Sequence, residues 1–400
     1  MTKFLHTADW QLGMKAISLG NAAEIVRGMR LETARKLLDI ARDEKVDFVL
    51  IAGDLFESNA VSRDIIEQLI EIFEKAPDIQ VFIISGNHDP LEPDSIYTQK
   101  IWNHVPSNVT VLSESKAVHL EKFNAILFPC PLNQKRSGID PTAWIPVEET
   151  EQIRIGIAHG TLDIGITSEP NFPINPDRVK ISGLDYLALG DWHSLLISDD
   201  GRTVYPGTPE ATSFEERDPG HCVIVKLEKG KLPELTVKNC SKLKWEIWNE
   251  DVESLKDVQG VMQKLNRMPD KDKTLITLKI TGVVDIEVLS AIDQISDTRE
   301  FLYLKVDQSE LYLKPSSLNS IVEVVPAGNL RRVADSLVAI LSREPRYSQN
   351  IDKPIDELES LLDMVKQWCS REAIKSNDMN VEVLQKALLL LYQFSKEVAG

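Results

Sequence analysis

Short apolar runs alternate with amphipathic segments over roughly the first 90 residues, and this alternation constrains the fold more than any other feature. The runs at 3–6, 48–52 and 81–84 have the length and the β-branched, aromatic composition of buried strands. Between them, residues 22–44 and 62–75 carry apolar side chains at helical spacing. A strand–helix–strand–helix–strand order is typical of parallel pairing with right-handed crossovers. The sequence therefore predicts an α/β fold.

Polar residues follow each of these three predicted strands. Asp9 and Gln11 come after the first, Asp54 follows a glycine after the second, and Asn87 follows Ser85-Gly86 after the third. A single such residue is more often a helix cap or a turn residue. Because the carboxyl ends of parallel strands meet at one edge of a sheet, three in register predict a shared ligand site.

The middle of the chain continues the pattern. Strand-like segments end in His159-Gly160 and in Gly190-Asp191-Trp192-His193. The predicted strands of this part are 109–112, 125–128, 153–158, 186–189 and 222–227. Three other histidines, His104, His119 and His221, are interpreted as ordinary surface or core residues.

The residues collected at this edge form a mixed set of carboxylates, imidazoles and amides. Such a set suits Mn²⁺, Fe²⁺, Mg²⁺ or Zn²⁺ rather than a metal that prefers thiolates. It is large enough for two ions, which can clamp both oxygens of a phosphoryl displacement, so phosphoester hydrolysis is the predicted chemistry. The set is Asp9, Gln11, Asp54, Asn87, His88, His159, Asp191 and His193.

Composition restricts the partners and the compartment. A net charge of −17 argues against general electrostatic attraction to nucleic acid, so contacts to DNA must come from local patches, bound cations or a basic partner. The four cysteines, without C-x-x-C spacing, are expected to be reduced structural thiols. The start of the chain lacks the apolar core of a signal peptide, and no run approaches membrane-spanning length. We expect a cytoplasmic protein that does not bind membranes.

Six motifs in order resemble the calcineurin-like metallophosphoesterases, and within them the nuclease subunit of the SbcCD type, a double-strand-break repair nuclease family. The motifs are H-T-A-D-W, A-G-D-L-F, S-G-N-H-D, A-H-G, L-G-D-W-H and Y-P-G-T-P-E-A-T. The resemblance implies a β-sandwich flanked by helices as the nuclease domain, over residues 1–240. It also implies a small α/β capping domain at 241–320 and a helical C-terminal segment at 321–400.

The same resemblance implies a role for each motif residue. Asp54 would bridge two divalent ions, with Mn²⁺ expected and Mg²⁺ as the alternative. One ion would be completed by Asp9, Gln11 and His193, and the other by Asn87, His159 and Asp191. His88 would be catalytic, stabilising charge on the phosphate or protonating the leaving oxygen. Asp89, also placed with the catalytic residues, would orient His88 or hold the turn.

Two residues depart from the family pattern. Gln11 stands where the family usually has the histidine of Asp-x-His, and Asp191 where it has the first histidine of Gly-His-x-His. Two nitrogen ligands are thus replaced by oxygen ligands, which favours Mn²⁺ or Mg²⁺ and leaves the Gln11 site the looser. The alternative is a weakened enzyme kept as a scaffold.

The C-terminal 160 residues read as two further parts. Strand-like segments at 274–280, 301–306 and 311–314 with a helix at 285–295 predict the α/β unit, which is a capping domain or a generic accessory domain. Its loop at 267–273 mixes charges of both signs and is a poor DNA-binding patch.

Amphipathic helices are predicted at 330–341, 355–368 and 381–398, with polar linkers between them. A helix after a linker usually packs on its own domain. The resemblance implies instead that the last one docks on an SbcC-type coiled-coil ATPase in a helix-in-groove mode.

The leading hypothesis is therefore a metal-dependent DNA exonuclease or endonuclease, expected to be a homodimer and to act with that ATPase on DNA. Lys135 and Arg136, near the site, are candidates for phosphate contact, although solvated surface charge is the simpler interpretation. The alternatives are a phosphoesterase for nucleotides or phosphoproteins and a non-catalytic scaffold.

Overall fold

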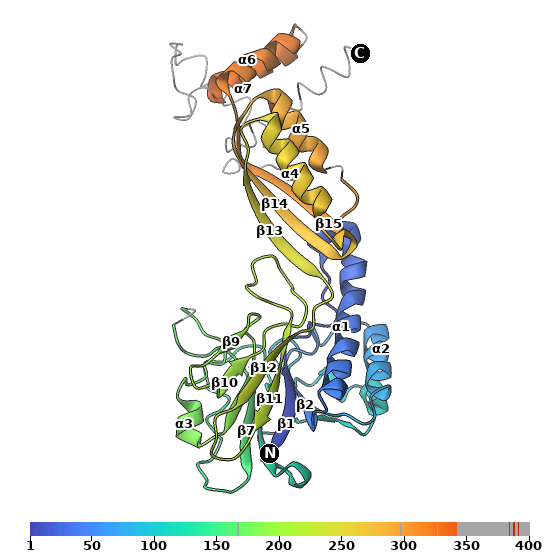
Figure 1. Ribbon diagram of the computed structural model, residues 1–400, viewed down its shortest axis with the longest axis vertical. Coiled ribbons are helices and arrows are strands. Elements are labelled where there is room, and N and C mark those ends of the chain that lie inside the picture. The colour runs from blue at the N-terminus through green and yellow to red at the C-terminus, as the bar shows by residue number, and fades with distance from the viewer. Residues whose placement is uncertain are drawn as a thin grey trace. The chain divides into compact units, whose positions relative to one another are not determined.

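The computed structural model describes residues 1–165, 168–296, 298–325 and 327–341, together with Leu384, Ala387, Leu388 and Leu391. The chain divides into two compact units, Met1–Trp245 and Glu246–Gly400 (Figure 1). None of the helices in the described residues is long and apolar enough to cross a membrane.

The first unit contains two six-stranded mixed sheets. The first has the order β12-β11-β1-β2-β3-β4, in which β1 to β4 run parallel, β11 is antiparallel to β1, and β12 is antiparallel to β11. Its strands are β1 (Thr2–Thr7), β2 (Phe48–Ala52), β3 (Gln80–Ile84), β4 (Val109–Val111), β11 (His221–Leu227) and β12 (Glu234–Asn239).

The second sheet has the order β5-β6-β7-β8-β10-β9, with β6, β7, β8 and β10 parallel and an antiparallel strand at each edge. Its strands are β5 (Val118–Leu120), β6 (Ala125–Cys130), β7 (Ile153–His159), β8 (Tyr186–Gly190), β9 (Leu196–Ile197) and β10 (Thr203–Tyr205).

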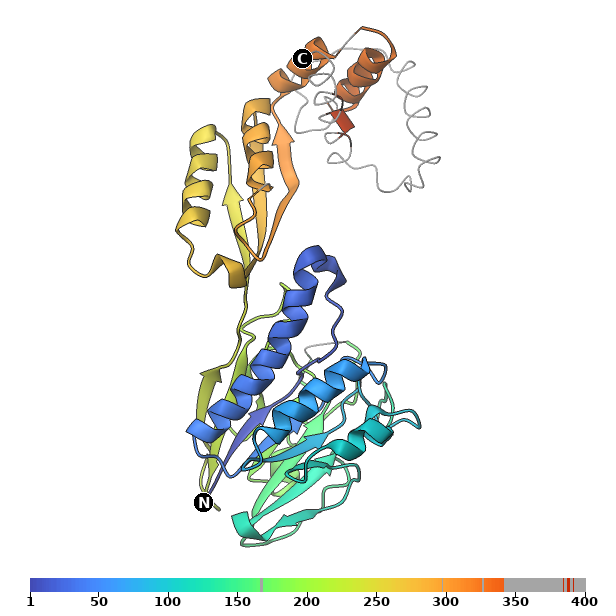
Figure 2. The same ribbon diagram turned by 90° about the vertical axis from the view of Figure 1, so that its right-hand side faces the viewer.

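Alternation along the strands assigns each side chain to one of the layers. In the first sheet, Phe4, Phe48 and Leu50 pack toward the second sheet, whereas Leu5 and Val49 pack under the helices. The long helix α1 (Ala23–Asp43) and α2 (Arg63–Glu74) lie side by side over that outer face (Figure 2). The short helix α3 (Arg178–Ser182) packs on the outer face of the second sheet.

The prediction of an α/β sandwich flanked by helices is confirmed. Each strand and helix predicted in the first half begins and ends within about two residues of the corresponding element in the structure. Differences of this size are usual at the ends of helices and strands. Short 3₁₀ helices occur at η1 (Ile17–Ala22), η2 (Ile96–Thr98), η3 (Lys100–His104) and η4 (Glu121–Phe123). Cys130, Cys222 and Cys240 are free and buried, as predicted, and Cys369 lies outside the described residues.

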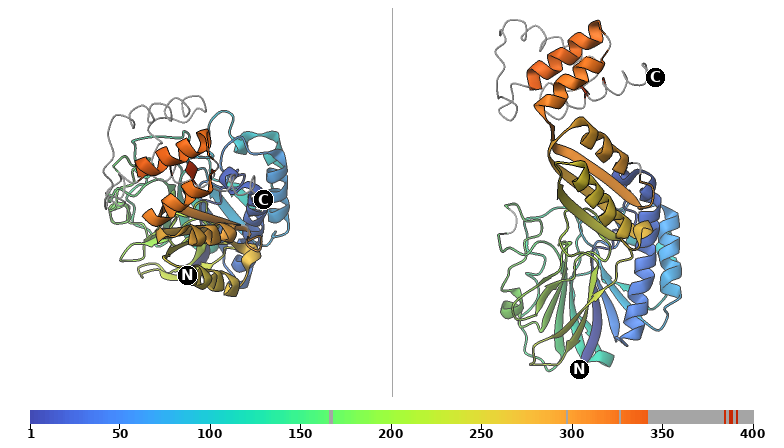
Figure 3. Two further views of the ribbon diagram at one scale, coloured as in Figure 1. Left: turned by 90° about the horizontal axis from the view of Figure 1, so that it is seen from above. Right: turned by 45° about the horizontal axis from the view of Figure 1, so that its top comes forward.

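The second unit has a three-stranded sheet, β13-β14-β15, with α4 and α5 side by side against it (Figures 1 and 3). Its strands are β13 (Lys244–Asp251), β14 (Thr274–Val284) and β15 (Tyr303–Leu313). Its helices are α4 (Leu255–Arg267), η5 (Lys271–Lys273), α5 (Ile286–Ser296), α6 (Pro315–Val324) and α7 (Asn329–Leu341).

Two predictions for this unit need correction. The segments 301–306 and 311–314 are one strand, β15, because a register shift between Lys279 and Thr281 of β14 accommodates one extra residue of β15 and the ladder continues through its polar stretch. The sequence reading also omitted α4, whose start carries a capping box formed by Ser254 and Asp257.

Most of the predicted C-terminal helices, at 355–368 and 381–398, lie outside the described residues. The helix predicted at 330–341 is present as α7. Leu384 and Leu388 are buried in the core of the second unit, together with Leu337 and Leu341 of α7.

Candidate metal centre

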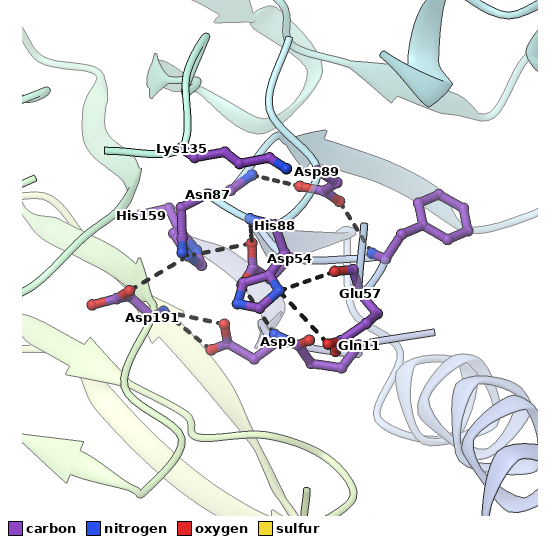
Figure 4. Close-up of polar contacts among 12 residues, drawn as sticks. Asp9, Gln11, Asp54, Glu57, Asn87, His88, Asp89, Lys135, His159 and Asp191 are labelled. Carbon is purple, nitrogen blue, oxygen red and sulfur yellow. Dashed lines mark hydrogen bonds and ion pairs between the residues drawn. The ribbon is translucent and has the colours of Figure 1, made fainter. Parts of the chain in front are cut away.

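Five strand ends bring the predicted site residues to one edge of the sandwich. Asp9, Asp54 and Asn87 follow β1, β2 and β3, His159 ends β7, and Asp191 follows β8. One ligand atom from each of Asp9, Asp54 and His159 lies within 4.8 Å of the other two, and all three residues are buried. Figure 4 shows these side chains together with Asp191 pointing toward one another. The parallel topology therefore produces the convergence that the strand order predicted.

Asp54 is at the centre of the cluster, and its two oxygens face different neighbours. Oδ1 accepts a hydrogen bond from the backbone N–H of His88 at 2.9 Å and lies 3.5 Å from Nε2 of His159. Oδ2 accepts from the amide nitrogen of Gln11 at 3.0 Å. With its side chain 3% exposed, Asp54 has the two-sided geometry required of a bridging carboxylate.

His159 is oriented by its backbone contact. Nδ1 donates to the carbonyl oxygen of Ala52 at 2.8 Å, which directs Nε2 toward Oδ1 of Asn87, also at 2.8 Å. Metal-binding histidines usually donate their other ring N–H to a carbonyl or carboxylate in this way. Burial lowers the pKa of His159, but Asp54, Asp9 and Asp191 raise it to a net value of about 9. An excess of negative charge thus surrounds Nε2, as a cation site requires.

Asp9 and Asp191 are joined through the backbone. The N–H of Asp191 lies 3.2 Å from both carboxylate oxygens of Asp9, and the Thr161 hydroxyl donates to Oδ2 of Asp191 at 2.8 Å. Burial raises the pKa of Asp9 to about 7, with Asp54 and Asp191 adding to the shift and His159 and His193 opposing it. A buried carboxylate with so raised a pKa would be stabilised in its charged form by a bound cation.

His193 is held by a residue that the sequence reading did not identify. Its Nδ1 lies 2.6 Å from Oε1 of Glu216, and the Thr212 hydroxyl is 3.2 Å away. Burial lowers the pKa of His193, while the hydrogen bond to Glu216 and the charge of Asp9 raise it to about 9. Glu216 thereby fixes the ring through Nδ1, as the carbonyl of Ala52 does for His159, the arrangement that metal-binding histidines usually have.

Gln11 lies directly beside the central carboxylate. Its side chain is buried and turns its amide nitrogen, not its oxygen, to Asp54. For the amide oxygen of Gln11 to coordinate a metal ion, the terminal amide must rotate by about 180°. This rotation exchanges the positions of its oxygen and its nitrogen. As arranged, Gln11 is a donor to the central carboxylate.

His88 lies at the open side of the cluster. Its side chain is 41% exposed and its Nδ1 donates to the carbonyl oxygen of Glu57 at 3.0 Å, leaving Nε2 3.9 Å from Oδ2 of Asp54. A group that contacts substrate needs this combination of a fixed ring and an accessible nitrogen. Its position agrees with the role implied by the resemblance.

Asp89 does not reach His88. Its carboxylate accepts from the N–H of Gly86 at 2.7 Å, the N–H of Phe56 at 3.1 Å and the Tyr97 hydroxyl at 2.6 Å. Burial and the neighbouring Asp54 raise its pKa to about 6. Of the two interpretations of Asp89, these contacts favour the residue that holds the turn, because they fasten the loop after β3 to the loop after β2.

Backbone strain is concentrated at this edge. Asp9, Gln11, Asp54 and Asp191 all have positive φ, at 54°, 50°, 51° and 103°. Non-glycine residues adopt such values at a cost of about 1–3 kcal/mol each and do so mainly at functional sites. Gly86 supplies the room, since a Cβ there would lie 2.1 Å from Oδ1 of Asp54. The fold therefore accepts strain to aim these side chains inward.

The donor set fits divalent cations, since buried carboxylates share the site with two histidines whose Nδ1 atoms are already engaged. The positioning residues Glu216, Thr161 and Ala52 were missed. Thr161 and Glu216 lie in irregular segments and Ala52 acts through its carbonyl, so no periodic pattern marks them.

Comparison with known proteins agrees with this geometry. Residues 2–195 match the family model described as calcineurin-like phosphoesterase. This matched part is similar to that family and contains Asp9, Asp54, Asn87, His159 and Asp191, whose geometry is described above.

A Bacillus subtilis (strain 168) protein named "Uncharacterized metallophosphoesterase YhaO" is 28% identical over 275 residues, which are 65% of this chain and 65% of that protein. The chain thus aligns with less than two thirds of that relative. Among solved structures, the crystal structure of TT1561 of Thermus thermophilus covers 60% of this chain and 99% of its own, with 12% identity and a TM-score of 0.37.

Proposed function

We propose that the protein is a metal-dependent DNA nuclease that hydrolyses phosphodiester bonds at this centre. The observation that carries the proposal is the convergence of Asp9, Asp54 and His159 beneath an accessible His88. Divalent ions, when bound, supply the Lewis acid that polarises a phosphoryl group and activates water. His88, held by Glu57, would donate a hydrogen bond or a proton to the phosphate oxygens.

The residues that would hold these ions form two overlapping groups around Asp54. In this proposal, Asp9, Gln11 and His193 would hold one ion and Asn87, His159 and Asp191 the other, with Asp54 between them. We expect two Mn²⁺ ions, with Mg²⁺ as the alternative. The match is to the family as a whole, so DNA as the substrate and an SbcC-type coiled-coil ATPase as a partner are supported only by the order of the six motifs.

The test is Mn²⁺-dependent cleavage of linear double-stranded and single-stranded DNA by the purified chain, alongside His88→Ala. His119→Ala is the matched control, because His119 is an exposed histidine on β5 outside the centre. Cleavage that is lost in His88→Ala, retained in His119→Ala and abolished by a chelator would support the nuclease. Hydrolysis of small phosphate esters without cleavage of DNA would favour the nucleotide or phosphoprotein alternative.

A scaffold function is a second candidate, and it rests on Gln11 and Asp191, the two residues that depart from the family pattern. In that case the Gln11 side of the centre would hold no ion. Calorimetric titration with Mn²⁺ distinguishes the two, because the nuclease requires two ions per chain and the scaffold predicts one or none.

A further inference from the structure

An open cavity of about 770 Å³ lies beside the candidate metal centre. Asn87, His88 and Asp191 line it on the side of the centre. Lys135 and Arg136, from the loop that follows β6, also line it. Among the described residues these are the only lysine and arginine that line the cavity, so they are its local source of positive charge.

Both basic side chains are exposed, and neither has an ion-pair partner among the residues that the structure describes. The cavity also contains two acidic side chains, Glu57 and Glu169. The chain as a whole has a net charge of −17. Lys135 and Arg136, without an ion-pair partner beside a cluster of carboxylates, are therefore positioned to bind an anion from outside the chain.

The loop that carries them, residues 133–138 and here called the basic loop, is held by a second loop. Asn171 donates through Nδ2 to the carbonyl oxygen of Lys135 at 3.0 Å and accepts through Oδ1 from the N–H of Ser137 at 3.1 Å. The N–H of Phe172 also donates to the carbonyl oxygen of Ser137 at 2.8 Å. Three hydrogen bonds thus fix the backbone beneath the two charges.

This second loop is in turn tied to the metal centre. A Cβ at Gly160, the residue after His159, would lie 2.4 Å from the carbonyl oxygen of Phe172, so only glycine permits this approach. Phe172 is buried and has a φ of 49°, a strained value for a bulky side chain. Strain and close contact together set the basic loop at a fixed position relative to His159.

We propose that Lys135 and Arg136 form a second phosphate subsite, which binds a phosphate of the substrate adjacent to the one at the metal centre. The proposal rests on the proposed phosphodiesterase function and gives it a substrate class, namely esters with two neighbouring phosphates. Arginine and lysine both bind phosphate, arginine through a planar fork and lysine as a point charge. The second phosphate is either the next phosphodiester of a nucleic acid strand or the other half of a pyrophosphate.

The first experiment compares substrates that differ by one phosphate. The thymidine dinucleotide TpT carries one phosphodiester, the trinucleotide TpTpT carries two, and TppT carries a pyrophosphate. For K135A/R136A we expect the KM of TpTpT to rise about tenfold, the equivalent of one charge-assisted hydrogen bond, with kcat and the KM of TpT little changed. The charge-preserving K135R/R136K should retain most of the wild-type KM.

The matched control is K116A/K180A, which removes the same charge from two exposed lysines that do not line the cavity. A rise in KM confined to TpTpT indicates a nucleic acid strand, and one confined to TppT indicates a pyrophosphate; both support the subsite. Equal changes for TpT and TpTpT, no change, or the same effect in the control would overturn it.

A second measurement does not require turnover. Binding of a fluorescent oligothymidylate is followed by anisotropy over a range of salt concentrations in the presence of Mn²⁺. Loss of the contact to this one phosphate of a single strand should make the slope of log affinity against log salt less steep by about 0.7 in K135A/R136A. An unchanged slope, or no binding by the wild type, would overturn the nucleic acid form of the subsite, and together with an unchanged KM for TppT it would overturn the subsite itself. A changed slope without hydrolysis would retain it while refuting the nuclease.

Discussion

Two buried histidines of the same sandwich have pKa values shifted in opposite directions. His6 lies between the sheets, and His159 lies at the strand ends. His6 of β1 donates through Nε2 to the carbonyl oxygen of Leu189 at 3.2 Å and accepts through Nδ1 from the Tyr186 hydroxyl at 3.0 Å. Burial lowers the pKa of His6 to about 3, whereas three carboxylates raise that of His159 to about 9. Both histidines are buried, so burial does not explain why their pKa values differ. The carboxylates around His159 distinguish the candidate metal centre from the core.

Replacement of the central carboxylate should break this contrast most strongly. Asp54→Asn keeps the size of the side chain but removes the negative charge that most raises the pKa of His159. We expect the Mn²⁺-dependent hydrolysis to fall by more than about 10³-fold, since metal ions contribute several kcal/mol to such reactions. The check is steady-state kinetics with an oligonucleotide substrate.

The same variant has a readout that does not depend on activity. In the metal-free protein, NMR titration should show the pKa of His159 falling in Asp54→Asn toward its ordinary value, while His6 stays neutral over the same range. A pKa of His159 that does not move would mean that the cluster is not electrostatically coupled as described.

Substitution in the core should have a smaller effect of a different kind. His6→Leu leaves the Tyr186 hydroxyl and the Leu189 carbonyl buried without their partner, which we expect to lower the free energy of unfolding by about 2–4 kcal/mol. Urea denaturation measures this loss. His6→Leu should bind the same number of Mn²⁺ ions as the wild type. A variant that no longer binds Mn²⁺ would show that the metal centre depends on this part of the core.

The pH dependence separates the same two regions, because the histidines of the centre and the histidine of the core contribute to stability with opposite signs. His159 and His193 have folded pKa values of about 9, so the stability they contribute is complete below their unfolded pKa of about 6.5 and is lost as the pH rises through 9. His6, with its lowered pKa, contributes stability above about 6.5 that is lost as the pH falls toward 3.

Thermal unfolding of the metal-free protein should therefore show a Tm that falls between about pH 6.5 and 9, by about 2–4 °C for each kcal/mol lost. Added Mn²⁺ should raise the Tm more at pH 9 than at pH 6.5, because a bound cation takes the place of the protons on the imidazoles of His159 and His193. A Tm that rises over this interval in the metal-free protein would contradict the raised pKa values.

The sequence was sufficient to predict the parts of this centre that follow from regular elements. Asp9, Asp54 and Asn87 were placed by the ends of β1, β2 and β3, because strand periodicity and parallel order determine where a strand end lies. Glu216 could not be predicted, since it reaches His193 from an irregular segment 23 residues later. The direction of the Gln11 amide was equally out of reach, because only its contact with Asp54 decides it.

The close approach of Gly86 to Asp54 has a consequence for the mutational tolerance of the chain. Every amino-acid replacement of a glycine adds at least one carbon atom, and here the first carbon already overlaps the central carboxylate. In a saturation library, alanine at this position should therefore score as poorly as leucine, without the usual gradation by size. Gly53 and Gly190, where a Cβ would lie 2.3 Å from Nδ1 of His159 and 2.1 Å from the carbonyl oxygen of Ala52, should show the same flat profile. Three such codons, each after or within a predicted strand end, would mark the edge of the site to anyone who had only the library and the sequence.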